Sequence, residues 1–404
     1  MITTINNKHN KLNFSSEREQ SQACLNSAEH EKNQGRKVLN VPNLRFKEFQ
    51  EEWEKTKFGD IAIVVGGGTP DTNTSQYWNG KIQWFTPSEI GRNKYVYNSV
   101  RTISEEGLNK SSAKLLPIGT ILLSSRATVG ECSINKKECT TNQGFQSLIP
   151  KENISNEFVY YLIQTKRKDL IRKSCGSTFL EISANEVRKI VVSIPTIKEQ
   201  DKIAKLLSLL DERIATQNKI IDKLQSLIKG ITQKIVRNNM PNVRLTECLE
   251  CKSSTLQESE VCEQGTYPVY GANGIVGYLD NYNTEGEAVY IIKDGSGVGT
   301  VSYVTGKCSA TGTLNTLQAK EGYSLQYLYY LLKVFNFEPY KTGMAIPHIY
   351  FKDYGKAKVF CPSYTEQLQY ARLLSAIESK LSIEKNILIS LSLQKQYLLR
   401  QMFI

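Results

Sequence analysis

Two long stretches of the chain, residues 195–236 and 362–403, share one pattern of apolar residues, and this pattern constrains the fold more than any other feature. In the first stretch, apolar side chains recur at alternating steps of four and three residues, and only Gln217 interrupts the series. A repeat that averages about 3.5 residues is typical of a helix that buries an apolar seam against a partner helix. At about 1.5 Å per residue, a helix of this extent would be roughly 60 Å long. The first stretch therefore predicts a long helix with a partner.

The second stretch repeats the first at a shift of 167 positions without a gap. A capping-box pair at the helix start, Thr196 with Glu199, recurs as Ser363 with Glu366, and the polar interruption recurs at Glu384. The alternative is two unrelated amphipathic surface helices, and a gapless shift that covers caps and seam together argues against it. We therefore predict that the two helices pair with each other. The expected seam residues are Ile203, Leu207, Leu210, Ile214, Ile221, Leu224 and Ile228 in the first helix and Leu374, Ile377, Leu381, Leu388, Leu391 and Leu398 in the second.

The charge balance of the chain favours a polyanionic partner. With 404 residues the chain is long enough for two or three domains, and its net charge of +11 makes nucleic acid the first candidate partner. The nine cysteines are scattered and odd in number, which is typical of a reducing cytoplasmic compartment rather than of a disulfide framework. No signal peptide and no apolar run of about twenty residues is evident, so we expect neither secretion nor a membrane span.

The regions outside the long helices alternate short β-like runs with turn signals, and the second region repeats the plan of the first. Residues 119–125 match residues 286–292 at the same shift of 167, whereas the loops diverge. We therefore predict an α+β fold in which two duplicated mixed α/β domains are separated by two long helices. The expected segments are a poorly ordered extension (1–40), the first domain (41–194), the first long helix (195–240), the second domain (241–361) and the second long helix (362–404).

The motifs of several enzyme classes are absent from the sequence. It contains no N-P-P-[YF] or D-P-P-Y motif of amino-methyltransferases and no G-x-x-x-x-G-K-[ST] phosphate loop. Three histidines far apart in sequence offer no nucleophile–base set, and the single C-x-x-C at Cys248 and Cys251 lacks further zinc ligands. We therefore expect no catalytic residue, no metal site and no cofactor bound by this chain. The glycine-rich runs at 66–70 and 295–299 are interpreted first as a turn and a strand-connecting loop, with close approach to DNA as the alternative.

An ordered set of short motifs runs through the chain. It comprises residues 42–46, Trp53, 67–70, 84–90, 267–271 and 274–278, together with the helix starts Pro195 with 199–200 and Pro362 with 366–367. This set, with the internal repeat, resembles the specificity subunit of type I restriction-modification systems. In that family, two target-recognition domains alternate with two helical regions that pair as an antiparallel coiled coil. The resemblance covers about residues 41–404, and residues 1–40 depart from it.

The resemblance implies a DNA-recognition subunit without chemistry of its own. Its partners would be double-stranded DNA, two methyltransferase (modification) subunits and two restriction/translocase subunits, with S-adenosylmethionine, ATP and Mg²⁺ bound by those protein partners. Each domain would read one half of a bipartite site, and the coiled coil would set the spacer and dock the methyltransferase subunits, which directs adenine methylation and restriction. Two other classes stay open, namely a coiled-coil adaptor that binds only proteins and a DNA-processing enzyme.

Candidate DNA contacts come from polar residues in the expected loops. Arg, Asn and Gln can read base edges, whereas Lys, Arg, Ser and Thr commonly contact phosphates. The candidates are Arg92, Lys94, Ser124, Arg126, Thr128, Gln143 and Thr178 in the first domain and Tyr270, Asn273, Lys293, Ser296, Thr311 and His348 in the second. A basic helix end, made by Lys166, Arg167, Lys168, Arg172 and Lys173, could equally be a solvated face or a phosphate contact.

Overall fold

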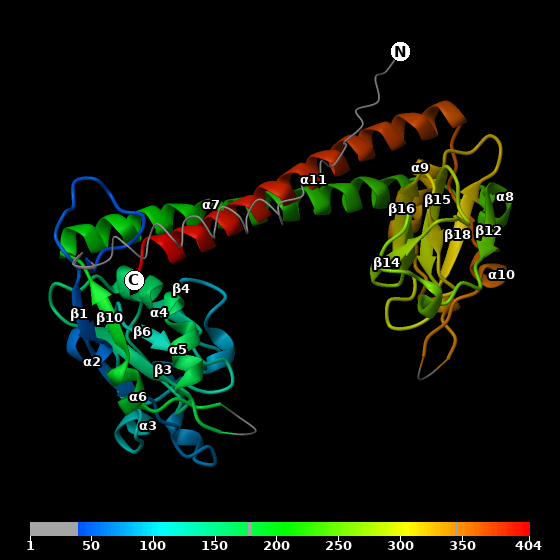
Figure 1. Ribbon diagram of the computed structural model, residues 1–404. Coiled ribbons are helices and arrows are strands. Elements are labelled where there is room, and N and C mark those ends of the chain that lie inside the picture. Colours follow the sequence, from blue (N-terminus) through cyan, green and yellow to red (C-terminus); the bar gives the residue numbers. More distant parts are fainter. Residues whose placement is uncertain (1–38, 177–179, 344–345) are drawn as a thin grey trace, which may run out of the picture. The chain divides into compact units, whose positions relative to one another are not determined.

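The computed structural model describes residues 39–176, 180–343 and 346–404. The expected N-terminal extension, residues 1–40, lies outside this range except for its last two residues. The chain forms two compact units, one that ends at residue 207 and includes residues 396–404, and one that comprises residues 208–395 (Figure 1). The division falls within both long helices, so the five expected segments stay a prediction.

In the residues that the structure describes, the first unit contains three sheets and five short α-helices. A five-stranded sheet has the order β2 (Ala62–Gly66), β9 (Gln146–Pro150), β6 (Ile121–Leu123), β7 (Cys132–Asn135) and β4 (Tyr95–Val96). A three-stranded sheet has the order β5 (Arg101–Ile103), β3 (Trp78–Phe85) and β8 (Cys139–Thr141), and β1 (Glu54–Lys57) pairs with β10 (Val191–Ile194). The helices are α2 (Phe58–Ile61), α3 (Glu105–Asn109), α4 (Asn156–Thr165), α5 (Arg167–Arg172) and α6 (Ala184–Lys189).

The core of the first unit is completed by the far end of the chain. Helix α4 buries six consecutive residues from Phe158 onward, and Phe403 stacks on Phe158 with 5.2 Å between ring centroids. The same Phe403 ring meets Trp53 edge-on at 6.3 Å. The Lys166 ammonium donates to the backbone oxygen of Ile404 at 2.8 Å. Residues from both ends of the described chain therefore share one aromatic cluster.

The second unit repeats this plan. Its four-stranded sheet has the order β12 (Leu249–Ser253), β18 (Leu314–Ala319), β15 (Glu287–Ile292) and β16 (Val301–Thr305). A three-stranded sheet has the order β14 (Gly274–Leu279), β13 (Tyr267–Gly271) and β17 (Ser309–Ala310), and β11 (Val243–Arg244) pairs with β19 (Lys358–Val359). Helices α8 (Leu245–Cys248), α9 (Leu325–Val334) and α10 (Phe351–Tyr354) complete it. The predicted α+β fold with two duplicated mixed domains is confirmed.

The hydrogen bonds correct the alignment of the two domains by one residue. The backbone of Ser124 bonds to Glu131 and Gly130, and the backbone of Ile292 bonds in the same way to Thr300 and Gly299. Ser124 thus corresponds to Ile292, a shift of 168 positions, and the shift of 167 expected for residues 119–125 is wrong at this strand. Strands β6 and β15 are buried along nearly their whole length, so either shift aligns apolar residues and the pattern cannot decide between them.

The two long helices, α7 (Ile197–Arg237) and α11 (Tyr364–Gln401), pair as an antiparallel coiled coil within the second unit (Figure 1). Gln217 contacts Glu384, and Asp211 forms a 2.6 Å ion pair with Lys395, so the paired residues advance in opposite directions along the chain. Of the expected seam residues in this unit, Leu210, Ile221, Ile228, Leu374, Leu381 and Leu391 are buried, and Ile214, Leu224, Ile377 and Leu388 are half-buried. Ile203 and Leu207 are buried in the core of the first unit, and Leu398 packs against that core half-buried.

The polar interruption of the two seams is a direct contact. The Gln217 amide nitrogen donates to the backbone oxygen of Glu384 at 3.0 Å and also to the Glu384 carboxylate. The hydrogen bond from Gln217, and after it the bond from Lys380, hold the pKa of the Glu384 carboxyl below its ordinary value. A polar pair at one seam position satisfies its hydrogen bonds only in this register, and such a pair commonly fixes the pairing of helices.

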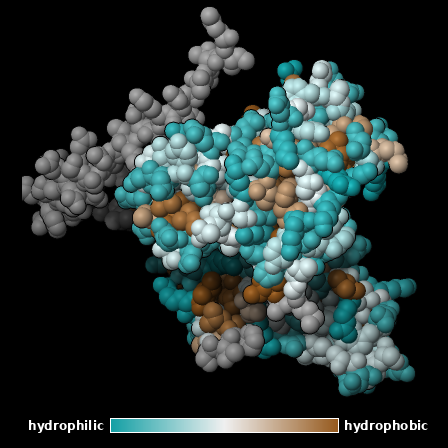
Figure 2. All heavy atoms as spheres, turned by 90° about the vertical axis from the view of Figure 1, so that its right-hand side faces the viewer, coloured by the Kyte–Doolittle hydropathy of each residue, from teal (hydrophilic) through white to brown (hydrophobic). Residues whose placement is uncertain are grey.

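The long helices are too polar for a membrane span. Within residues 39–176, 180–343 and 346–404, no helix joins the necessary length to sufficient apolar character. Figure 2 shows hydrophilic residues over much of one face of the molecule, with hydrophobic residues in small separate areas.

Candidate nucleic-acid interface

Three segments of the first unit meet beyond the end of β6. The backbone N–H of Ser125 donates to the oxygen of Gly144 at 2.8 Å, and the N–H of Ile182 donates to the oxygen of Ser125 at 3.0 Å. Cys175 and Glu181 exchange two backbone hydrogen bonds of 2.9 Å. We call residues 124–131, 142–145, 175–176 and 180–182 the first loop cluster. It gathers the candidate contact residues Ser124, Arg126, Thr128 and Gln143, which the sequence spreads over twenty positions.

The second unit builds the same cluster after β15. The N–H of Lys293 donates to the oxygen of Thr313 at 3.0 Å, and the N–H of Ile349 donates to the oxygen of Lys293 at 2.9 Å. Thr342 and His348 exchange two backbone bonds of 2.9 and 2.8 Å. We call residues 292–300, 311–314, 342–343 and 346–349 the second loop cluster. The two clusters have one hydrogen-bonded frame, and they differ in the side chains that the frame presents.

The side chains of the first loop cluster divide into surface and supporting groups. Arg126 is about half exposed and forms a 2.8 Å ion pair with Glu181. Thr128 is exposed and shares a 2.9 Å hydrogen bond with Ser124, which is fully buried. Gln143 is exposed and accepts a hydrogen bond from the Thr69 hydroxyl. Ser124 therefore supports the loop in this conformation and does not reach its surface. The candidate Thr178 lies outside the described residues.

The remaining candidates of the first unit have different surroundings. Arg92 is exposed. Lys94, by contrast, is a structural lysine, since only 9% of its side chain is exposed and its ammonium lies 3.0 Å from the Glu157 carboxylate and 3.3 Å from the Tyr161 hydroxyl. Burial raises the pKa of Glu157, but the hydrogen bonds from Tyr95 and Lys94 outweigh burial and leave that pKa lowered. The expectation of a DNA contact at Lys94 does not fit this structure, because a contact would require breaking that pair.

The second unit also places its candidates at different depths. Tyr270 is half-buried on β13 against the Tyr290 ring, with 5.6 Å between centroids, and burial raises its pKa. Asn273 is exposed in the turn that joins β13 to β14. Thr311 is buried and shares a 2.8 Å hydrogen bond with Thr313, so it supports its loop and the expected DNA contact there does not fit. Tyr270 and Asn273 remain open to a ligand only at their exposed atoms.

The glycine-rich loop at 295–299 joins β15 to β16 and presents Ser296 to solvent. Gly295 has φ +96°, a backbone conformation that favours glycine, and its N–H donates to the oxygen of Pro347 at 3.0 Å. Lys293, before this loop, is half-buried. His348 approaches from the neighbouring segment, and its Nδ1 lies 2.7 Å from the Asp294 carboxylate. The first amide of this loop is therefore used within the protein, as expected of a strand-connecting loop.

Two of the glycines in residues 66–70 are needed for packing. A Cβ on Gly67 would lie 1.9 Å from the backbone oxygen of Asn142, and a Cβ on Gly68 would lie 2.3 Å from the backbone nitrogen of Ala113. Such distances exclude any side chain at either position. Close packing therefore explains these glycines without an approach to phosphate.

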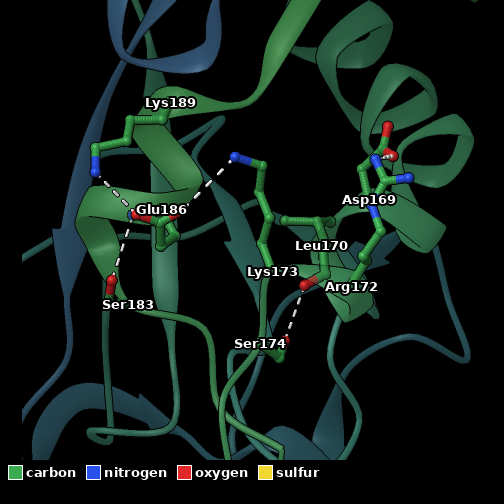
Figure 3. A network of polar contacts seen from close by, with 8 residues as sticks. All are labelled: Asp169, Leu170, Arg172, Lys173, Ser174, Ser183, Glu186 and Lys189. Atoms are coloured by element: carbon green, nitrogen blue, oxygen red, sulfur yellow. Dashed lines mark hydrogen bonds and ion pairs between the residues drawn. The ribbon is translucent and has the colours of Figure 1, made fainter.

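The basic helix end is partly neutralised by carboxylates. Arg172 pairs with Asp169 at 2.7 Å, and Glu186 pairs with Lys173 at 3.6 Å and with Lys189 at 2.9 Å. Figure 3 shows Glu186 between the two lysines. The hydrogen bond from Lys189 is the main reason why the pKa of Glu186 is lowered. Of the other residues in this group, Arg167 pairs with Glu131 at 2.8 Å, Lys166 binds Ile404 as described above, and Lys168 is exposed. This helix end therefore presents less net positive charge than its sequence suggests.

In the part of the chain that the structure describes, no three His, Cys, Asp or Glu side chains gather as a metal ion would require.

Comparison with known proteins places the chain in a family. The family described as type I restriction modification DNA specificity domain matches residues 50–226 and 238–393, one match for each domain and most of its following helix. The two matches together cover most of the 404 residues.

Individual relatives match different shares of the chain. The type I restriction enzyme MjaIX specificity subunit of Methanocaldococcus jannaschii is 40% identical over 181 residues, which are 43% of this chain and 42% of that protein. The chain thus spans less than half the length of that relative. The EcoprrI specificity subunit of Escherichia coli is 24% identical over 363 residues, with 81% of this chain and 88% of that protein aligned.

Solved structures share the fold over nearly the whole chain. The crystal structure of a type I restriction-modification system S subunit from M. genitalium matches with a TM-score of 0.62 at 19% identity, covering 90% of this chain and 99% of that one. A structure described for complex assembly and conformational transition of the type I system matches with a TM-score of 0.54 at 16% identity, covering 86% and 96%. With both domains matched, the chain belongs to the type I restriction modification DNA specificity domain family.

Proposed function

We propose that this chain is the sequence-specific DNA-recognition subunit of a type I restriction-modification complex, and that each domain reads one half of a bipartite site. The observation that carries this proposal is the pair of loop clusters, since one hydrogen-bonded frame holds different side chains in the two family-matched domains. Lys293 of the second domain occupies the place that Ser125 has in the first, and His348 occupies the place of Glu181. A constant frame with variable side chains suits two readers of different base sequences.

The charge of the chain supports DNA as the ligand. A net charge of +11 provides attraction to phosphates that does not depend on sequence. Exposed Arg92, Thr128, Gln143, Asn273 and Ser296 remain the candidates for direct contact. DNA as ligand also favours the cytoplasm as the site of action.

The coiled coil is proposed to set the spacer and to dock two methyltransferase subunits. Support for docking comes from the outer surface of α11, where Leu373, Ile383, Ile387, Leu393 and Tyr397 are exposed apolar side chains. Exposed apolar residues gathered on one helix are typical of a protein-binding surface. S-adenosylmethionine would be bound by the methyltransferase subunits, and ATP and Mg²⁺ by two restriction/translocase subunits, so this chain would be non-catalytic.

The test is to co-purify the chain with its methyltransferase subunit and to map methylated adenines in DNA treated with S-adenosylmethionine. We expect methylation only at a two-part sequence with a fixed spacer, and none without this chain. A complex that forms but methylates without sequence preference would instead support a protein-binding adaptor. Methylation by the purified chain alone would refute the non-catalytic assignment.

A further inference from the structure

The first loop cluster is closed by one ion pair between two of its segments. Arg126, on the loop after β6, donates through Nε to a Glu181 carboxylate oxygen at 2.8 Å. The two residues also face each other as a β-bridge, and Glu181 is bridged on its other side to Cys175. The pair therefore fastens the segment 180–182 to the loop 124–131.

The second loop cluster has a pair at the same place in the frame, with the carboxylate on the opposite partner. Asp294, on the loop after β15, accepts from the imidazole Nδ1 of His348 at 2.7 Å. These residues also form a β-bridge, and His348 is bridged on its other side to Thr342. The loop thus supplies the cationic group in the first domain and the carboxylate in the second.

A carboxylate on a DNA-facing edge repels phosphate unless a cationic group lies against it. Glu181 meets that condition through Arg126, and the Asp294 carboxylate is bound instead by the imidazole Nδ1 of His348. All four side chains are between about one third and one half exposed, so each pair adds little to the stability of its domain. The pairs are thus better suited to fixing the position of a loop than to holding the fold together.

We propose that Arg126 with Glu181, and Asp294 with His348, are positioning pairs that hold each loop cluster in its DNA-reading geometry. In each domain the residue on the segment suits only the loop of the same domain. A histidine at position 181 would face the Arg126 guanidinium, and a glutamate at position 348 would face the Asp294 carboxylate. This inference rests on the proposed function, and it assigns Arg126 to positioning rather than to base contact.

The test converts each pair into the other type. In the complex with the methyltransferase subunit, Glu181→His places an imidazole against Arg126, and Arg126→Asp restores a carboxylate–imidazole pair of the second-domain type. In the second domain, His348→Glu places a carboxylate against Asp294, and Asp294→Arg restores a pair of the first-domain type. The readout is the dissociation constant for a duplex altered in one half-site divided by the dissociation constant for the cognate duplex.

We expect each single substitution to lower this ratio about ten- to a hundredfold for its own half-site, which is about the discrimination that one well-placed base contact provides. Each double variant should return to within a few-fold of the unaltered complex, and discrimination at the other half-site should not change. A double variant as weak as Arg126→Asp alone would overturn the proposal, because it would mean that Arg126 itself contacts DNA. Failure of the unaltered complex to discriminate would refute the proposed function instead.

Discussion

A matched insertion of seven residues into both long helices tests whether the coiled coil sets the spacer of the proposed DNA site. Because Gln217 contacts Glu384 in the antiparallel pair, residues inserted directly after Gln217 lie opposite residues inserted directly before Glu384. The inserted segments are a second copy of residues 218–224 in α7 and a second copy of residues 377–383 in α11. They place an apolar residue at each added seam position. The register on both sides of the insertion is then unchanged.

The size of the effect follows from helix geometry. Seven residues lengthen a helix by about 10 Å and make about two turns, which returns the seam to the same face. Ten ångströms along DNA is about three base pairs at 3.4 Å each. We therefore expect the preferred spacer to grow by about three base pairs, while both half-site sequences stay the same. Three base pairs also rotate one half-site by roughly 100° about the duplex, at about 10 base pairs per turn, so weaker binding is expected too.

The assay is binding of the methyltransferase complex to duplexes whose spacer is varied one base pair at a time. The control carries the insertion in α7 alone, which puts the seams of α7 and α11 out of register by seven residues on one side of the insertion and should unfold part of the coil. An unchanged spacer preference in the matched variant would refute the reasoning, and so would altered half-site sequences. Helical content from circular dichroism verifies that the longer coil has formed.

Three further predictions concern stability. Arg45 binds the fully buried Glu199 carboxylate through two bonds of 2.7 Å, so Arg45→Ala should lower the free energy of unfolding by about 3–5 kcal/mol in urea titrations, more than Arg45→Lys. Phe403→Ala should lower the free energy of unfolding by about 3–5 kcal/mol, because it removes a buried ring. If Phe403→Leu keeps the thermal midpoint of the unaltered chain, the lost side-chain volume is the cause. Burial raises the pKa of Glu378, but hydrogen bonds, first among them that from Lys333, outweigh it and leave the pKa lowered. The resulting stabilisation is present above the unfolded pKa of about 4.3 and is lost as pH falls through the folded value. The thermal midpoint of Glu378→Gln should therefore fall less between about pH 5 and 3 than that of the unaltered chain, and an equal fall in both proteins would contradict this.

The long helices were predictable because their signal is periodic. A seam that buries every third or fourth residue leaves a 3.5-residue repeat in the sequence, and the polar step at Gln217 and Glu384 marked a position that the structure shows to be a contact. How deeply a single polar side chain is buried leaves no such pattern in the sequence. Lys94, Ser124 and Thr311 are as polar as exposed loop residues, and their burial depends on partners far along the chain, such as Glu157 for Lys94.

The positioning pairs were missed for a different reason. Glu181 and Asp294 were not among the candidate residues, because carboxylates are poor partners for DNA. The different residue types also hide the equivalence of Glu181 with His348 in any alignment by residue type. Only the backbone hydrogen bonds, which do not depend on side-chain identity, make the two sites comparable.

The aromatic cluster of the first unit has a consequence for the timing of synthesis. Trp53 and Phe158 leave the ribosome early, but the ring that stacks on Phe158 belongs to Phe403. At about 5–20 residues per second, the roughly two hundred and forty residues between them take about 10–50 s to translate. During that interval the first unit lacks part of its core and exposes apolar surface that Phe403 later covers. A nascent chain of this kind needs protection until Phe403 emerges, even though its first domain is made first.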